Sequence, residues 1–174
     1  MTATDRTAYP RLDERMSRAE LAANFTLSES EHAFVVAQAR GNVNRLAFAI
    51  LMKARQAYGL FVHPDALSET IVAHVAEQLV LPVPSLVVTS RLGLHRYRSA
   101  IRTHIGGALY DKAAQELVET TTTHAAATMS DPADLINRAI EALFNAHIDL
   151  PAFSTLDRTV NRVRAAVHRD IFAT

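Results

Sequence analysis

Glycine and proline are scarce inside the segments of this 174-residue chain, and β-branched residues rarely alternate with polar ones. Alanine and leucine, which favour helices, dominate instead. Apolar residues recur at steps of three and four, the spacing that gives a helix one buried face, whereas a half-buried strand has a period of two. The pattern therefore predicts an all-α protein.

Residues that start and stop helices divide the chain into segments. Ser28 and Glu31 form a capping-box pattern, Gly41 and Gly59 follow apolar helical segments, and Asp131 precedes a proline suited to a first helical position. Expected helices cover residues 11–24, 28–39, 43–58, 68–80, 94–105, 111–129, 132–147 and 154–172, with a short one at 85–90.

A pair of prolines marks the expected division of the chain. Pro82 and Pro84 interrupt the helical pattern and leave little to continue one core. We therefore expect a boundary between residues 81 and 94. The prediction is two consecutive small helical modules of helix-turn-helix-like character, residues 1–90 and 91–174, with four helices in each half.

The sequence lacks the residues that several classes of function require. Cysteine is absent, which excludes disulfides and thiolate zinc sites and is consistent with a cytoplasmic location. The eight histidines show no i, i+4 pair, and no nucleophile elbow, P-loop or dinucleotide fingerprint occurs. The longest apolar run, residues 46–52, is too short for a membrane span. We expect no enzyme activity, no metal, no cofactor and no membrane association.

Basic residues are concentrated although the net charge is zero. No Asp or Glu occurs within residues 32–64, 78–110 or 158–169, and these three windows hold twelve of the eighteen Lys and Arg residues. Local patches of this kind attract polyanions even in a neutral protein, because the local field determines steering. Sixteen of the eighteen are Arg, whose planar fork binds phosphate oxygens and guanine edges. Ordinary solvated helix faces are the alternative interpretation.

Each window, together with the turn before the third one, contributes candidate DNA-binding residues. A turn before a buried helix carries the first group, a shared helix face at i, i+3 and i+7 carries the second, and the start and polar side of the last helix carry the third. The candidates are Arg40, Asn42, Asn44, Arg45; His95, Arg98, Arg102; and Ser154, Thr155, Arg158, Arg162, Arg169. Alternatively, Asn42 caps its helix, Arg45 pairs with a surface acid, and the α-helical face of the last group is merely solvated.

The last helix has the clearest geometry. Its apolar positions, Leu156, Val160, Val163, Val167 and Ile171, fall on one face, opposite the arginines. Together with the preceding helix and the turn at residues 149–151, it resembles a helix-turn-helix with a long turn.

Four stretches resemble the N-terminal region of the large replicative transposases of the Tn-three type. They are 40-RGNVNRLAFAILMKARQAYGLFV-62, 68-SETIVAHVAEQLVLP-82, 147-HIDLPAFSTLDRTVNRVRAAVHRDIF-172 and, more loosely, 94-LHRYRSAIRTHIGG-107. The segments at 150–158 and 44–49 are the most specific. The chain differs from that family at Ala47, commonly Gly there, and at 108-ALYD-111, which replaces a more basic aromatic segment.

The resemblance implies consecutive helical modules that bind double-stranded DNA at the terminal inverted repeats of a transposon. In that family a separate RNase H-like domain cleaves the strands, so by this resemblance the chain is a fragment or truncated product without catalysis. Its expected location is the bacterial cytoplasm, on the nucleoid when bound to DNA, with self-association possible through the full-length parent. The alternative is a helical protein-interaction or dimerisation module that does not read DNA.

Overall fold

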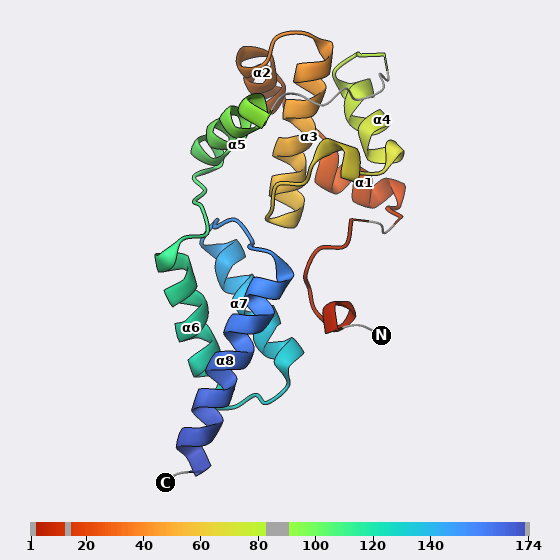
Figure 1. Cartoon of the computed structure of the whole chain (residues 1–174). Coiled ribbons are helices and arrows are strands. Elements are labelled where there is room, and N and C mark those ends of the chain that lie inside the picture. The colour runs from red at the N-terminus through yellow and green to blue at the C-terminus, as the bar shows by residue number, and fades with distance from the viewer. Residues whose placement is uncertain (1–2, 13–14, 83–90, 173–174) are drawn as a thin grey trace. The chain divides into compact units, whose positions relative to one another are not determined.

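The computed structural model describes residues 3–12, 15–82 and 91–172 (Figure 1). Within these ranges the chain forms eight α-helices and no strand, which confirms the all-α prediction. The helices are α1 (Arg18–Phe25), α2 (Glu29–Gln38), α3 (Asn42–Tyr58), α4 (Glu69–Gln78), α5 (Arg91–Ile105), α6 (Lys112–Ala126), α7 (Pro132–Asn145) and α8 (Phe153–Phe172). Two 3-10 helices, η1 (Ala3–Arg6) and η2 (Pro64–Ala66), complete the described elements.

The helices pack as two compact units. The first unit comprises residues 11–106 with α1–α5, and the second unit comprises residues 1–10 and 107–174 with α6–α8. The chain therefore starts in the second unit, builds the whole first unit and returns at Gly107. The division lies at residues 106 and 107, not between 81 and 94, and it gives five and three α-helices instead of four and four.

The boundary differs because α5 completes the core of the first unit. Leu94, Tyr97 and Ile101 are buried on one side of α5, in the same apolar cluster as the side chains of α3. The Phe48 ring of α3 meets the Tyr97 ring edge-on at 5.1 Å and the Phe34 ring of α2 at 5.4 Å. Such edge-to-face contacts are favourable beyond the area that they bury. One aromatic side chain thus joins three helices of the first unit.

Helix α3 is enclosed by its neighbours. All residues from 46 to 55 are buried, whereas the preceding turn, Gly41 and Asn42, is exposed. The first unit therefore leaves only the two end turns of α3 accessible to a ligand, and no extended face of this helix.

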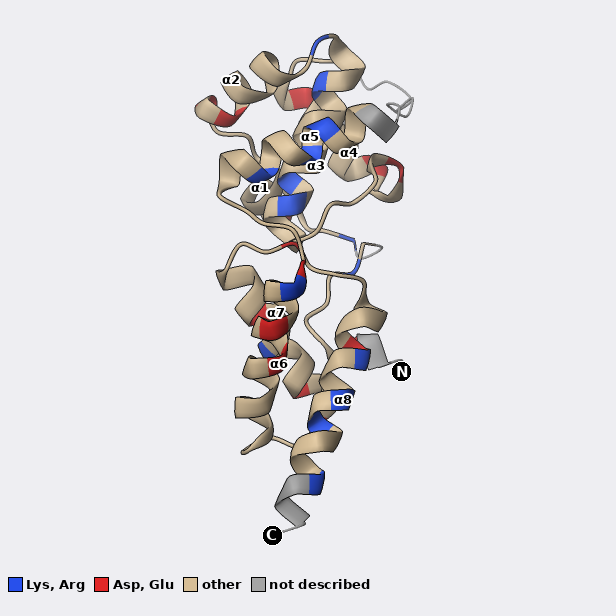
Figure 2. Cartoon of the chain, turned by 60° about the vertical axis from the view of Figure 1, so that its left-hand side comes forward, with Lys and Arg blue, Asp and Glu red and all other residues tan. Residues whose placement is uncertain are grey.

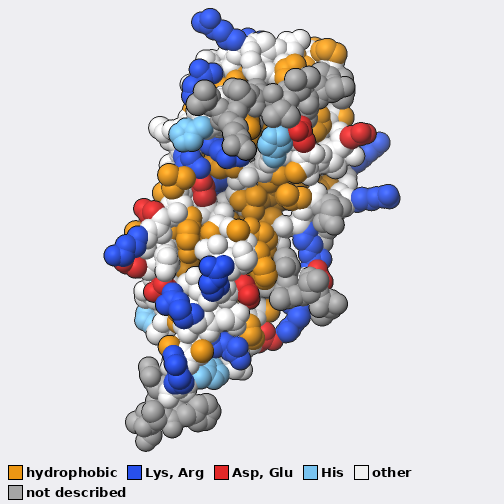
Figure 3. Space-filling model, viewed as in Figure 1, with side chains coloured by type: hydrophobic (Ala, Val, Ile, Leu, Met, Phe, Trp, Pro, Cys, Tyr) orange, Lys and Arg blue, Asp and Glu red, His pale blue; other side chains and the backbone are white. Residues whose placement is uncertain are grey.

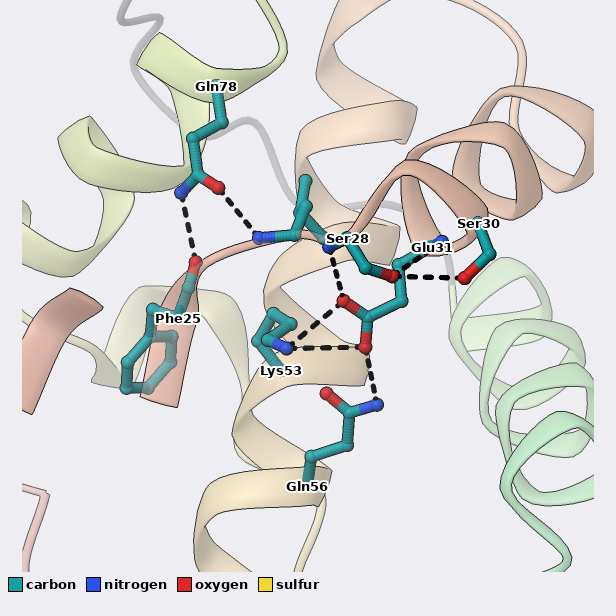
Figure 4. A network of polar contacts seen from close by, with 8 residues as sticks. Phe25, Ser28, Ser30, Glu31, Lys53, Gln56 and Gln78 are labelled. Carbon is teal, nitrogen blue, oxygen red and sulfur yellow. Dashed lines mark hydrogen bonds and ion pairs between the residues drawn. The ribbon is translucent and has the colours of Figure 1, made fainter. Parts of the chain in front are cut away.

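A partly buried polar network fixes the start of α2 on α3 (Figure 4). The Ser28 N–H donates to Glu31 Oε2 at 2.8 Å and the Glu31 N–H donates to Ser28 Oγ at 3.2 Å, which confirms the capping box. The same Glu31 carboxylate accepts from Lys53 Nζ at 3.2 Å and from Gln56 Nε2 at 2.8 Å, both on α3. Burial by itself raises the pKa of Glu31, but these hydrogen bonds and the Lys53 charge together lower it.

Gln78, the last residue of α4, ties the link between α1 and α2 in the same way. Its side-chain amide donates to the Phe25 carbonyl at 2.9 Å and its oxygen accepts from the Leu27 N–H at 2.7 Å (Figure 4). The amide therefore satisfies two backbone groups that a helix end leaves without partners.

The second unit is a three-helix arrangement in which α6, α7 and α8 all contact one another. Helix α7 ends in a Schellman motif: His147 takes a left-handed conformation with φ of 54°, and the Ile148 N–H donates to the Leu143 carbonyl at 2.9 Å. Ala108 then pairs with this turn, donating to the His147 carbonyl at 3.1 Å and accepting from the Asp149 N–H at 2.9 Å. The returning chain is thereby fixed at the end of α7.

The first residues of the chain belong to the second unit. Residues 5–9, here called the N-terminal strap, run along α7: Arg6 pairs with the N-cap residue Asp131, and the Ala8 N–H donates to Asn137 Oδ1 at 2.7 Å. Asp131 also caps α7 by accepting from the Ala133 N–H at 2.9 Å, as the sequence predicts.

Three expected helix starts change. Helix α1 begins at Arg18 instead of residue 11, because Ser17 and Glu20 form a second capping box. Helix α5 begins at Arg91 instead of residue 94. The last helix begins at Phe153, one residue before the expected start at Ser154. The short helix expected at residues 85–90 lies outside the described residues.

Candidate nucleic-acid interface

Helix α8 carries exposed arginines on the side opposite its buried apolar face, here called the buried seam. Leu156, Val160 and Val163 are buried as predicted, and Val167 is half-buried. The exposed arginines at 158, 162 and 169, here called the arginine row, lie roughly opposite these residues by helical geometry (Figure 2). Ile171, expected on the seam, lies outside the residues whose side chains are described. The row is the longest set of exposed predicted site residues on one helix face.

Members of the arginine row differ in their contacts. Arg162 Nη2 lies 2.5 Å from Glu119 Oε1 on α6, and that oxygen also accepts from Gln115 Nε2 at 2.8 Å. The hydrogen bonds from Gln115 and Arg162 hold the pKa of the Glu119 carboxyl below its ordinary value. Arg158 and Arg169 are exposed in solvent. Two of the three arginines are therefore presented freely, and one is already matched to a carboxylate.

The start of α8 is held by the N-terminal strap. The Tyr9 hydroxyl donates to the Pro151 carbonyl at 2.8 Å, and the Tyr9 ring meets the Phe153 ring edge-on at 5.5 Å. Burial raises the pKa of the Tyr9 hydroxyl, and a hydrogen bond with the Phe153 backbone partly opposes this rise. Ser154 is exposed and Thr155 half-buried in the first turn, where the Thr155 and Leu156 N–H groups already donate to the Ala152 carbonyl at 2.9 Å and 3.3 Å.

Two arginines of the second basic window, residues 78–110, lie against one aromatic side chain. The guanidinium groups of Arg98 and Arg102 lie 5.8 Å and 4.9 Å from the centre of the Phe61 ring, within cation–π range. Both are half-buried, whereas His95 on the same helix is exposed. The predicted face therefore exists, and its two arginines are held side by side by a residue of the loop after α3.

Some basic and polar residues of the first window, residues 32–64, lie at the surface, and others are held inside the fold. Arg40 and Asn42 are exposed, but Asn44 donates to the Arg40 carbonyl at 2.9 Å and Arg45 Nε donates to the Ala39 carbonyl at 3.2 Å. These two side chains thus stabilise the turn, although the sequence predicts that the turn exposes them to DNA. The alternative is also not observed: Gly41, with φ of 82°, is the N-cap instead of Asn42, and Arg45 bonds to a carbonyl.

Two further cations of the first window are buried. Lys53 pairs with Glu31, and Arg55 is only 4% exposed. They cannot meet a DNA backbone without unfolding part of α3. The concentration of basic residues in the sequence therefore overstates the basic surface.

Formal charge is unevenly shared by the two units. The first unit has eleven Lys and Arg against eight Asp and Glu, and the second has seven against ten. In the space-filling view, Lys and Arg side chains run along the region of α6 and α8 with acidic side chains between them (Figure 3). The arginine row is thus a local positive strip on a unit that is acidic overall.

Several contributors to these surfaces have no local signal in the sequence. Phe61 lies thirty-seven residues from Arg98, and Glu119 lies 43 residues from Arg162. Tyr9 is more distant still from Pro151. Only the structure brings these partners together.

Among the described residues, no three His, Asp or Glu side chains are grouped to hold a metal ion. In the same residues, no helix has the length and apolarity to cross a membrane.

These features define an all-helical protein of two units that displays arginines on its last helix. The chain belongs to the family called Domain of unknown function (DUF4158), whose model matches residues 1–163. The matched range includes Arg158 and Arg162 and ends before Arg169. No curated protein matches the chain.

Proposed function

We propose that this chain is the DNA-binding region of a replicative transposase, which recognises the terminal inverted repeats and positions a catalytic domain on them. The observation that carries the proposal is the arginine row on α8, set opposite a buried seam. The sequence resemblance at residues 147–172, which include this helix, supplies the biological context.

In this proposal α7, the turn and α8 act as a helix-turn-helix with a long turn. Helix α8 enters the major groove, where Arg158 can bind a guanine edge bidentately. Ser154 and Thr155 of the first turn contact a phosphate through their hydroxyl groups. The first unit contributes backbone contacts through its exposed or half-buried candidates, Arg40, Asn42, His95, Arg98 and Arg102.

The test is a salt titration on two duplexes, one carrying the inverted repeat of the encoding element and one with the same bases scrambled. Because Lys53 and Arg55 are buried and Arg162 is paired, we expect about five phosphate contacts and a slope of log affinity against log salt of about −4 to −5. The repeat should bind more tightly at every salt concentration, since base contacts carry the sequence preference. A slope shallower than about −2, or equal affinity for both duplexes, contradicts the proposal.

A second candidate is self-association, supported by exposed apolar side chains on the second unit. Leu109 is 59% and Phe144 44% exposed. Both lie near the pairing of Ala108 with His147, at one end of the unit. Solitary surface apolar residues are common, so the pair supports this candidate only if Leu109→Ser with Phe144→Ser abolishes a concentration-dependent increase in mass and leaves DNA affinity unchanged.

A further inference from the structure

The arginine row has a fixed anion beside it. The contact of 2.5 Å between Arg162 Nη2 and Glu119 Oε1 joins α8 to α6, and Gln115 of α6 donates to the same carboxylate oxygen at 2.8 Å. The side chains of Arg162 and Glu119 are 58% and 32% exposed. The pair therefore lies at the surface, and its partners can exchange without any loss of core packing.

We infer that Glu119 is a built-in competitor for DNA phosphate, which regulates the arginine row by occupying the guanidinium of Arg162. Carboxylate and phosphate oxygens accept from the same fork of donors, so only one of them can hold that edge of the guanidinium. This inference rests on the proposed DNA binding of α8.

Competition has a direct consequence for selectivity. Exposed ion pairs are weak in water, so a phosphate placed correctly against Arg162 can displace Glu119. A duplex that places no phosphate there meets a neutralised side chain and a nearby negative charge. The row therefore binds arbitrary DNA less tightly than three free arginines would, and the contribution of Arg162 is restricted to duplexes of the right geometry.

Glu119→Gln tests this inference in the full chain, with the inverted-repeat and scrambled duplexes as probes. The substitution keeps the shape and the hydrogen bond from Gln115 but removes the charge. We expect affinity for the scrambled duplex to rise about two- to five-fold, with a salt slope steeper by about 1, because one more arginine becomes available to phosphate. Affinity for the repeat should rise at least as much, because Arg162 no longer has to leave Glu119 before it contacts a phosphate.

Glu116→Gln is the matched control. Glu116 lies one turn earlier on α6 and pairs with Lys112 at 3.9 Å instead of with Arg162. Its substitution by glutamine removes the same charge as Glu119→Gln. We expect it to change affinity by less than about 1.5-fold, since its effect is limited to a screened field. In the double variant Glu119→Gln with Arg162→Ala, affinity should equal that of Arg162→Ala alone, because the effect of Glu119 acts through Arg162.

The outcomes separate this inference from the proposed function. If Glu119→Gln matches Glu116→Gln, or lowers affinity, the competitor role is overturned, while a loss of binding in Arg158→Ala still supports α8 as the DNA-binding helix. If the natural chain shows no preference for the repeat and Arg158→Ala has no effect, both proposals fall. Melting curves of every variant exclude unfolding as the cause, since a charge change at this exposed pair should leave the chain folded.

Discussion

Lys53 should stabilise the fold instead of binding DNA, although it lies within a basic window. Its side chain is 9% exposed and that of Glu31 is 14% exposed, with 3.2 Å between Nζ and the carboxylate. In Lys53→Met the apolar stem is retained, but the carboxylate of Glu31 loses its counter-charge while it stays largely buried. Loss of one partner of a buried pair costs about 3 to 5 kcal/mol.

The cost here should lie at or below the lower limit of that range, because Glu31 keeps two donors, the Ser28 N–H and Gln56 Nε2. We expect the free energy of unfolding of the first unit to fall by about 2 to 3 kcal/mol. At about 4 to 8 °C per kcal/mol for a unit of this size, the Tm falls by about 10 to 20 °C.

A second variant distinguishes the loss of charge compensation from a loss of packing. Glutamine also serves at the third position of a capping box, so Glu31→Gln with Lys53→Met removes both charges and keeps the cap. We expect the double variant to recover most of the loss and to lie within about 1 kcal/mol of the natural chain. Lys112→Met is the control, since the Lys112 side chain is 91% exposed; it should change stability by less than about 0.5 kcal/mol.

Urea and thermal unfolding followed by circular dichroism measure these differences. A Lys53→Met chain as stable as the natural one, or a double variant no more stable than the single one, would refute the argument. So would a salt slope for DNA binding that becomes shallower by about 1 in folded Lys53→Met, because that change is expected of a lost phosphate contact.

Three other measurements test the structure. Val80 is 89% exposed in a left-handed conformation with φ of 54°, so Val80→Gly should raise stability by about 0.5 to 1 kcal/mol, and a lower Tm would contradict the strain. Tyr9→Phe should lower stability by about 1 kcal/mol through the lost bond to Pro151, and Tyr9→Ala by about 2 to 3 kcal/mol because the contact with Phe153 is lost as well; equal effects would show that the hydroxyl contributes nothing. The pKa of Glu31 is lower in the folded chain than in the unfolded one, so its contribution is complete above the unfolded pKa and is lost as pH falls through the folded one; between about pH 5 and pH 3 the natural chain should lose more stability than Glu31→Gln, and parallel profiles would refute this.

Local patterns in the sequence predict much of the fold. The capping box at Ser28, the cap at Asp131 and the buried seam of α8 depend on residues within one or two helical turns, where geometry follows directly from spacing. The assignment of α5 does not. Its apolar side pairs with Phe48, almost fifty residues earlier, and no local spacing distinguishes this contact from packing against α6.

The candidate site is predictable to a smaller extent for the same reason. The sequence identifies the face of α8, but not the carboxylate that neutralises Arg162. It places Asn44 and Arg45 at an exposed turn, but their bonds to backbone carbonyls require the folded turn. Charge density along a sequence counts residues, whereas recognition depends on the exposed and unmatched ones.

The different charges of the two units suggest different contributions to DNA binding. A field in salt water decays over about 8 Å at physiological ionic strength, so a narrow positive strip on an acidic unit acts mainly on groups in contact with it. The first unit has an excess of cations, so the fields of its basic residues add and attract a phosphate backbone of any sequence. In the proposed function, then, Arg40, Arg98 and Arg102 chiefly promote encounter with DNA of any sequence. The arginine row of α8, partly masked by Glu119, contributes to binding only once the DNA is in contact with it. Sequences can be discriminated only under that condition.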